Sequence, residues 1–135
     1  MTTLSDHNGA MDRRAVEEWI EGYERLWRTP GTDGLADLFR PDATYQPSPW
    51  ASPVDGLEAI ARFWDEERDD ADEAFDLSAE VVAVDGDTAV VRVSVDYGRA
   101  NAGRWRDLWV IGFAEDGRCS SFEEWPFAPG QPDGH

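Results

Sequence analysis

The residues in this sequence that could do chemistry are carboxylic acids set among aromatic side chains. In the stretch GRWRDLWVIGF, residues 103–113, a strand would point Asp107 to the same face as Trp105 and Trp109, because side chains alternate along a strand. A second acid, Glu124, follows in the segment FEEW. A carboxyl group among apolar side chains is costly unless it is hydrogen-bonded, paired or functional. Asp107 and Glu124 are therefore the candidate acid/base groups.

The remaining composition excludes most other catalytic chemistry. All 12 basic residues are arginine, so no lysine is present to form a Schiff base. The two histidines, His7 and His135, lie near the chain ends, and there is a single cysteine. The sequence thus offers neither a catalytic histidine nor the ligands of a zinc site. We expect no metal and no cofactor.

The charge of the chain limits its partners. A formal net charge of −17 repels nucleic acid and anionic membranes. Much of the acidity lies in a run at residues 65–76, which we interpret as a solvated helix end and loop. The chain has no apolar run of ~18 residues and no recognisable signal peptide. We expect a cytoplasmic protein with no nucleic-acid or membrane partner.

One domain is expected, at residues 11–128 between polar tails at 1–10 and 129–135. Apolar spacing of three and four residues predicts a helix over residues 12–28, with Tyr23 in its apolar stripe. A short helix at 33–39 and a short strand at 42–46 follow.

A proline-rich loop around Trp50 comes next and could act as a lid. The third helix is expected to begin at Asp55 as N-cap, with Glu58 as capping-box partner, and to end near residue 68. Leu57, Ile60 and either Phe63 or Trp64 would lie on its buried face.

From residue 75 onward the apolar period changes to two, which predicts strands. A three-residue loop at 85–87 would pair Val81 with Val91, and a turn at Asp116-Gly117 would form a second hairpin. The second hairpin would pair Phe113 with Ser120, Ile111 with Phe122, Trp109 with Glu124 and Asp107 with Pro126. Helices grouped before an antiparallel meander predict an α+β fold, in which a curved sheet closed by helices encloses a cone-shaped pocket.

Four segments in this order resemble the SnoaL-like branch of the nuclear-transport-factor-2-like superfamily. They are the helix with Tyr23, LFRPDATY at 38–45, DGLEAIARFW at 55–64 and WVIGFAEDGRCSSFEEWPF at 109–127. The resemblance implies the same cone-shaped fold. The superfamily includes ketosteroid isomerases, polyketide cyclases, epoxide hydrolases and binding domains without catalysis, so function must be argued from the residues.

The ketosteroid isomerase pattern is mostly absent. That family uses a helix-one tyrosine, an aspartate base and a protonated aspartate as oxyanion donor. Tyr23 matches the tyrosine position, but the base position falls on Pro47 and the aspartate donor on Trp109.

Two other enzyme patterns match in part. Glu124 and Asp96 fall near the two acids of the limonene-type epoxide hydrolases, but their arginine position reads Ser94. The SnoaL-type polyketide cyclases use one aspartate in an aromatic pocket, a role that Asp107 or Glu124 could fill.

We expect the chain to bind a small, mostly apolar organic molecule without catalysis. The alternative is a cofactor-independent acid/base enzyme that uses Glu124 or Asp107 with Tyr23. Glu124 is the first choice of the two acids because the register places it deeper. The pocket is expected to be lined by Tyr45, Trp50, Trp64, Tyr97, Trp105, Trp109 and Phe122.

A homodimer is also expected. The second face of the Asp107 strand carries Arg104, Arg106, Leu108 and Val110, and Trp125 joins it from the last strand. Many proteins of the resembling fold dimerise through this outer sheet face.

Overall fold

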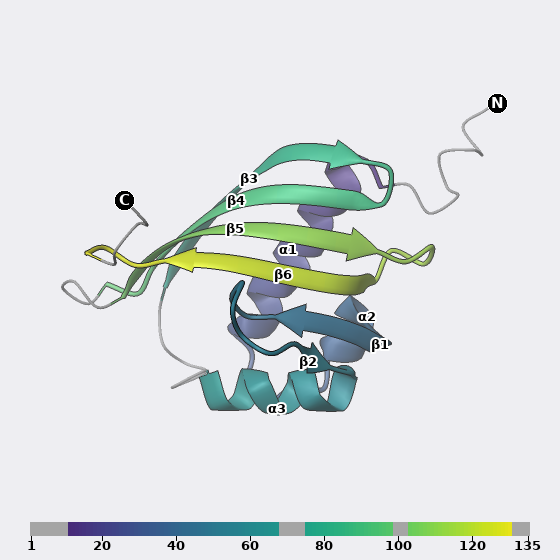
Figure 1. Cartoon of the computed structure of the whole chain (residues 1–135), viewed down its shortest axis with the longest axis horizontal. Helices are drawn as coiled ribbons and strands as arrows, with labels where there is room; N and C mark the ends of the chain where they lie inside the picture. Colours follow the sequence, from purple (N-terminus) through teal and green to yellow (C-terminus); the bar gives the residue numbers. More distant parts are fainter. Residues whose placement is uncertain (1–10, 68–74, 99–102, 131–135) are drawn as a thin grey trace.

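The computed structural model describes residues 11–67, 75–98 and 103–130. Two helices precede the first strand, and a third helix precedes a meander of four long strands (Figure 1). In chain order the elements are α1 (Arg13–Trp27), α2 (Leu35–Leu38), β1 (Phe39–Gln46), β2 (Val54–Asp55), α3 (Leu57–Glu67), β3 (Asp76–Asp85), β4 (Thr88–Asp96), β5 (Arg104–Phe113) and β6 (Cys119–Phe127).

Helix α1 forms where the apolar stripe predicts it. The Asp12 side chain caps its N-terminus by accepting the Ala15 N–H at 2.8 Å, and Arg28 follows its last turn. Its buried face includes Trp19 and Tyr23. The helix crosses one face of the sheet (Figure 1) and so carries Tyr23 toward β5 and β6.

The region between α2 and α3 differs from the prediction. Strand β1 starts at Phe39, earlier than expected, and pairs parallel with β6 and antiparallel with the unpredicted β2. Asp55 lies in β2 opposite Thr44, and Gly56 separates it from the first residue of α3. The predicted helix cap at Asp55 is therefore wrong. Gly56 makes this turn with a φ of +90°, and its N–H donates to the Ala43 carbonyl at 2.8 Å.

The six-stranded sheet has the order β2-β1-β6-β5-β4-β3. The predicted pairing of Val81 with Val91 is confirmed, but the loop is shorter by one residue because Asp85 pairs with Thr88. A register shift between Val81 and Ala83 absorbs the difference, as a β-bulge does.

The second hairpin keeps its predicted register over most of its length. Ile111 pairs with Phe122 and Trp109 with Glu124, as expected. At the turn Phe113 pairs with Cys119 rather than Ser120, after a second register shift.

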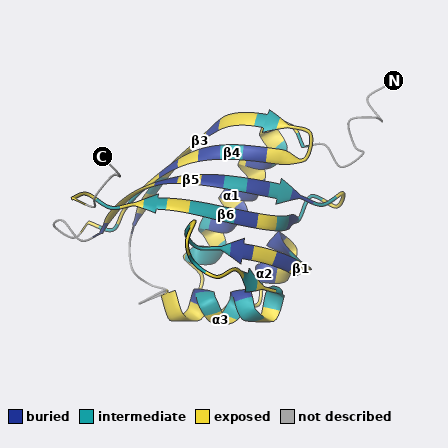
Figure 2. Cartoon of the chain, viewed as in Figure 1, coloured by how far each residue is buried: buried dark blue, intermediate teal, exposed yellow. Residues whose placement is uncertain are grey.

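One face of the sheet is buried and the other is largely exposed (Figure 2). The buried face packs against α1, α2 and α3 around a single apolar core. The α+β prediction is confirmed: helices cover a curved, unclosed, mostly antiparallel sheet. Within the part of the chain described, no helix is long and apolar enough to cross a membrane.

Candidate functional site

An aromatic cluster fills the interior between α1, α3 and the sheet. Tyr23 from α1 lies 4.6 Å from the Trp109 ring and 5.1 Å from the Trp64 ring, measured between centroids. Tyr45 from β1 stacks on Phe122 from β6 at 4.7 Å. All five side chains are at most 7% exposed. Five of the predicted site residues are thus brought together by five different elements.

Solvent exposure falls steeply along the inward-facing residues of β5. Trp105 is 37% exposed, Asp107 7% and Trp109 1%. Asp107 therefore lies where the exposed end of the strand meets the closed aromatic cluster. Its neighbours across the sheet are Val93 on β4 and Pro126 on β6, neither of which can solvate a carboxylate.

The two candidate acids form a pair. Because Glu124 is directly opposite Trp109 on the adjacent strand, Asp107 lies diagonally beside it. Burial raises the pKa of Glu124 well above its ordinary value, and the hydrogen bond and charge of Asp107 raise it further. Burial also raises the pKa of Asp107, while its hydrogen bond with Glu124 lowers it. Burial therefore favours the protonated form of both carboxyls, and their mutual hydrogen bond favours it further in Glu124 and opposes it in Asp107.

Three buried polar atoms at the cluster have no hydrogen-bond partner among the described residues. They are Asp107 Oδ1, Trp109 Nε1 and Trp64 Nε1. The Trp109 N–H lies near enough to both carboxyls to lower their pKa values, but it does not meet hydrogen-bond geometry with either. Because buried polar groups normally have partners, these atoms have capacity for a further polar group.

The hydroxyls of Tyr23 and Tyr45 lie near enough to the pair for the charges of Glu124 and Asp107 to affect their pKa values. Burial raises the pKa of Tyr23, and the nearby Glu124 charge raises it further, whereas a hydrogen bond with Tyr45 lowers it. Burial is also the largest cause of the raised pKa of Tyr45. Both side chains therefore stay neutral and keep hydroxyl protons that can be donated.

This arrangement provides an acid, a base and neutral donors in a mostly apolar interior. A carboxylic acid beside a carboxylate can give and accept a proton at adjacent positions. The same groups can instead hold the polar end of a ligand by hydrogen bonds. Among the described residues, no group of three or more His, Cys, Asp or Glu side chains is placed to hold a metal ion.

Three predicted pocket residues lie outside the cluster. Trp50 is 99% exposed in the loop after β1, so the structure does not place it over the site as a lid. The Tyr97 hydroxyl accepts the Trp27 indole N–H at 3.1 Å, and its ring packs on Phe75 at 5.4 Å. Trp105 lines a surface groove at the end of β5.

The interior covers both acids. As whole residues, Asp107 is 7% exposed and Glu124 is half-buried, and burial is the largest cause of the raised pKa of each carboxyl. Treating the acids as alternatives also missed their pairing. The predicted hairpin register already contained that signal, since positions two residues apart on facing strands are diagonal neighbours.

Sequence reasoning also missed two aromatic residues beside the site. Trp19 lies 6.0 Å from Phe122, and Phe39 lies 6.3 Å from Trp64. The Trp19 indole donates to the Leu38 carbonyl at 3.0 Å and so ties α1 to the start of β1.

Solved structures of similar shape share the architecture of this chain. The epoxide hydrolase/cyclase-like enzyme SalBIII, of pyran ring formation in the polyether salinomycin, has a TM-score of 0.66 at 15% identity over 86% of this chain and 93% of its own. The protein SMa1630 from Sinorhizobium meliloti, a proposed polyketide cyclase, has a TM-score of 0.58 at 27% identity, over 82% of this chain and 97% of its own. A steroid delta-isomerase from Pseudomonas aeruginosa has a TM-score of 0.62 at 20% identity, over 88% of this chain and 83% of its own. The curated proteins contain no match.

These likenesses define the class as the NTF2-like α+β cone, as expected from the order of the elements. The chain belongs to the family of the SnoaL-like domain, whose model matches residues 16–122. The fold alone does not choose between catalysis and binding within this class.

Proposed function

We propose that the chain binds a small, mostly apolar organic molecule whose polar group meets the Asp107–Glu124 pair. The observation that carries this proposal is the set of unpartnered polar atoms: Asp107 Oδ1, Trp109 Nε1 and Trp64 Nε1 lie buried among aromatic rings. A ligand with one oxygen-bearing group would give these atoms partners while its apolar body contacts the rings. Ligand sites commonly combine apolar walls with a few placed polar groups in this way.

A second candidate is a cofactor-independent acid/base enzyme of the cyclase, isomerase or epoxide-opening kind. The Asp107–Glu124 pair favours it, because the pKa of Glu124 is raised by burial and by Asp107 while the hydrogen bond with Glu124 lowers the pKa of Asp107, which separates an acid from a base. In such an enzyme Glu124 would give a proton, Asp107 would accept one, and the Tyr23 hydroxyl would donate to a developing oxyanion. The same residues serve both functions, so only turnover distinguishes them.

The test is ligand binding followed by tryptophan fluorescence. Aromatic polyketides, terpenoids and steroids would be titrated into wild type, Glu124→Gln and Glu17→Gln, the last an exposed carboxyl on α1. We expect saturable quenching by at least one class, about tenfold weaker in Glu124→Gln and unchanged in Glu17→Gln. A response from no class, or equal affinity in all three proteins, would contradict the proposal.

If the protein converts a bound compound to product, the acid/base enzyme is supported in place of binding without catalysis. Product formation by wild type that Asp107→Asn and Glu124→Gln each abolish, with binding retained, would identify the acid and the base. Binding without product over long incubation would favour the non-catalytic reading.

We also propose a homodimer that uses the outer sheet face. Leu108 is 36% exposed and Trp125 39%, side by side on β5 and β6. Light scattering after gel filtration should give twice the 15.1 kDa chain mass for wild type and the monomer mass for Leu108→Asp. A wild-type monomer would contradict it.

The cytoplasmic location and the lack of nucleic-acid or membrane partners stay predictions.

A further inference from the structure

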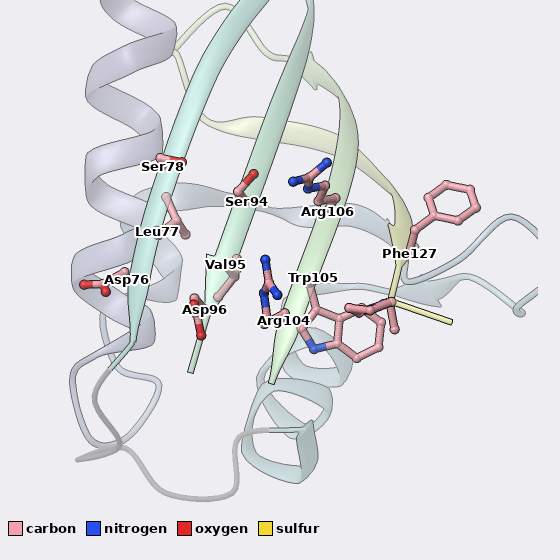
Figure 3. A pocket seen from close by; sticks show the side chains of 12 residues that line it. Asp76, Leu77, Ser78, Ser94, Val95, Asp96, Arg104, Trp105, Arg106 and Phe127 are labelled. Carbon is pink, nitrogen blue, oxygen red and sulfur yellow. The ribbon is translucent and has the colours of Figure 1, made fainter. Parts of the chain in front are cut away.

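A groove lies on the surface where β3, β4 and β5 meet the end of β6, away from the aromatic cluster. Its volume is about 510 Å³, within the range of small-molecule sites. Figure 3 shows its lining side chains on these neighbouring strands. The charged and hydroxyl side chains that line it are Asp76, Ser78, Ser94, Asp96, Arg104 and Arg106.

One row of polar residues crosses the floor of this groove. Ser78 pairs with Ser94, Ser94 with Arg106, and Arg106 with Phe127, so four strands contribute adjacent positions (Figure 3). Val93 and Asp107, the sequence neighbours of this row, are buried on the other face, so alternation turns Ser94 and Arg106 outward. Two hydroxyls and a guanidinium in line are the donors that an oxyanion binds.

The side chains of the two arginines that line the groove form no interaction with other described residues that would stabilise the fold. Within the described ranges, the Arg104 and Arg106 side chains make no ion pair or hydrogen bond, although the chain has 29 acidic residues for 12 arginines. Two residues further along β3 and β4, the Arg92 guanidinium forms an ion pair with Glu80 at 2.6 Å. Asp96, directly opposite Arg104, instead accepts the Gly98 N–H at 2.8 Å.

Aromatic surface lies beside these cations. Phe127 pairs with Arg106 and so lies on the same face; it is 48% exposed and lines the groove. An exposed ring next to an uncommitted guanidinium gives a ligand apolar contact and charge recognition together. The acids Asp76 and Asp96 also line the groove and repel a multiply charged anion more strongly than a singly charged one.

We propose that this groove is a second binding site and that it takes a small aromatic carboxylate. The carboxylate binds the Arg106 guanidinium and the Ser94 and Ser78 hydroxyls, and the ring of the ligand lies against Phe127. The site is on the opposite face of the sheet from Asp107 and Glu124 and does not depend on the function proposed for them.

The test is an NMR titration of the ¹⁵N-labelled full chain with benzoate, benzamide and inorganic phosphate. We expect benzoate to shift the amide signals of Ser78, Ser94, Trp105 and Arg106 saturably. Benzamide, which has the ring without the charge, and phosphate, which has charge without the ring, should each bind at least about tenfold more weakly. Equal binding of benzamide, shifts at Asp107 and Trp109 instead, or no saturable shift would overturn the proposal.

Variants check that the guanidinium recognises the ligand. Arg106→Gln should weaken benzoate at least about tenfold, and Arg106→Lys should give an intermediate affinity because it keeps the charge but not the forked donors. Arg14→Gln removes the same charge from an exposed position on α1 and should leave the affinity unchanged. If Arg14→Gln weakens benzoate as much as Arg106→Gln, only overall charge matters and the site is excluded. A wild-type dimer that covers Arg106 and excludes benzoate would equally contradict the proposal.

Discussion

At the scale of single residues, the interior is defined by two neighbouring carboxyls whose pKa values are both raised by burial. Asp107 lies between Val93 and Pro126, and burial there disfavours a second negative charge beside Glu124. Between its ordinary value of 4.5 and its raised pKa, Glu124 is protonated in the folded chain and ionised in the unfolded chain. The folded chain then holds more protons, so the free energy of unfolding falls as pH rises through this window.

Replacing Glu124 with glutamine should remove this loss of stability. At pH 7, Glu124→Gln should unfold with a free energy at least about 1 kcal/mol higher than wild type, since one pKa unit is worth about 1.4 kcal/mol. Near pH 4 the two proteins should be close, because wild-type Glu124 is protonated in both states. Urea unfolding at a series of pH values measures the difference, with Glu17→Gln as control. Parallel pH profiles for wild type and Glu124→Gln would show that Glu124 ionises normally.

At the scale of elements, the sequence predicts what depends on local period and misses what depends on distant contacts. The long hairpins and the inward face of β5 follow from alternation, and Asp107 is on the predicted face. Strand β2 has only two residues, too few to show a period, and the parallel β1–β6 pairing joins segments far apart in the chain. The proline-rich loop around Trp50 also has no regular period, so its sequence did not predict that this side chain is 99% exposed.

The link between β2 and α3 depends on one glycine. Gly56 has a φ of +90°, which a side chain with a Cβ rarely adopts. Gly56→Ala should therefore lower the free energy of unfolding by about 1–2 kcal/mol. Gly56→Asn should cost less, because asparagine tolerates positive φ better than alanine. Thermal and urea unfolding of both variants check this; an alanine variant as stable as wild type would show that the turn carries no such constraint.

At the scale of the whole molecule, a net charge of −17 on 135 residues acts against the compact state. The ion pairs that offset it include Arg14–Glu18 and Arg62–Glu58, whose side chains are at least 64% exposed. Such exposed pairs contribute little. Repulsion among the remaining carboxylates is therefore the larger electrostatic effect on stability.

Salt should stabilise the fold. Raising ionic strength from about 0.01 to about 1 M shortens the screening length from about 30 to about 3 Å, which weakens this repulsion. We expect the Tm to rise by a few degrees, equally in sodium and potassium chloride, because screening does not depend on the cation. Differential scanning calorimetry measures it. A Tm that falls with salt would mean that attractive ion pairs dominate instead.

The pairing of Asp107 and Glu124 is tested most directly by carboxyl ¹³C NMR of the full chain across pH. Glu124 should titrate well above 4.5, and the Asp107 signal should change in the same steps because the two groups are coupled. Independent titrations near 3.8 for Asp107 and 4.5 for Glu124 would contradict the pairing, and with it the acid and base roles assigned to this interior.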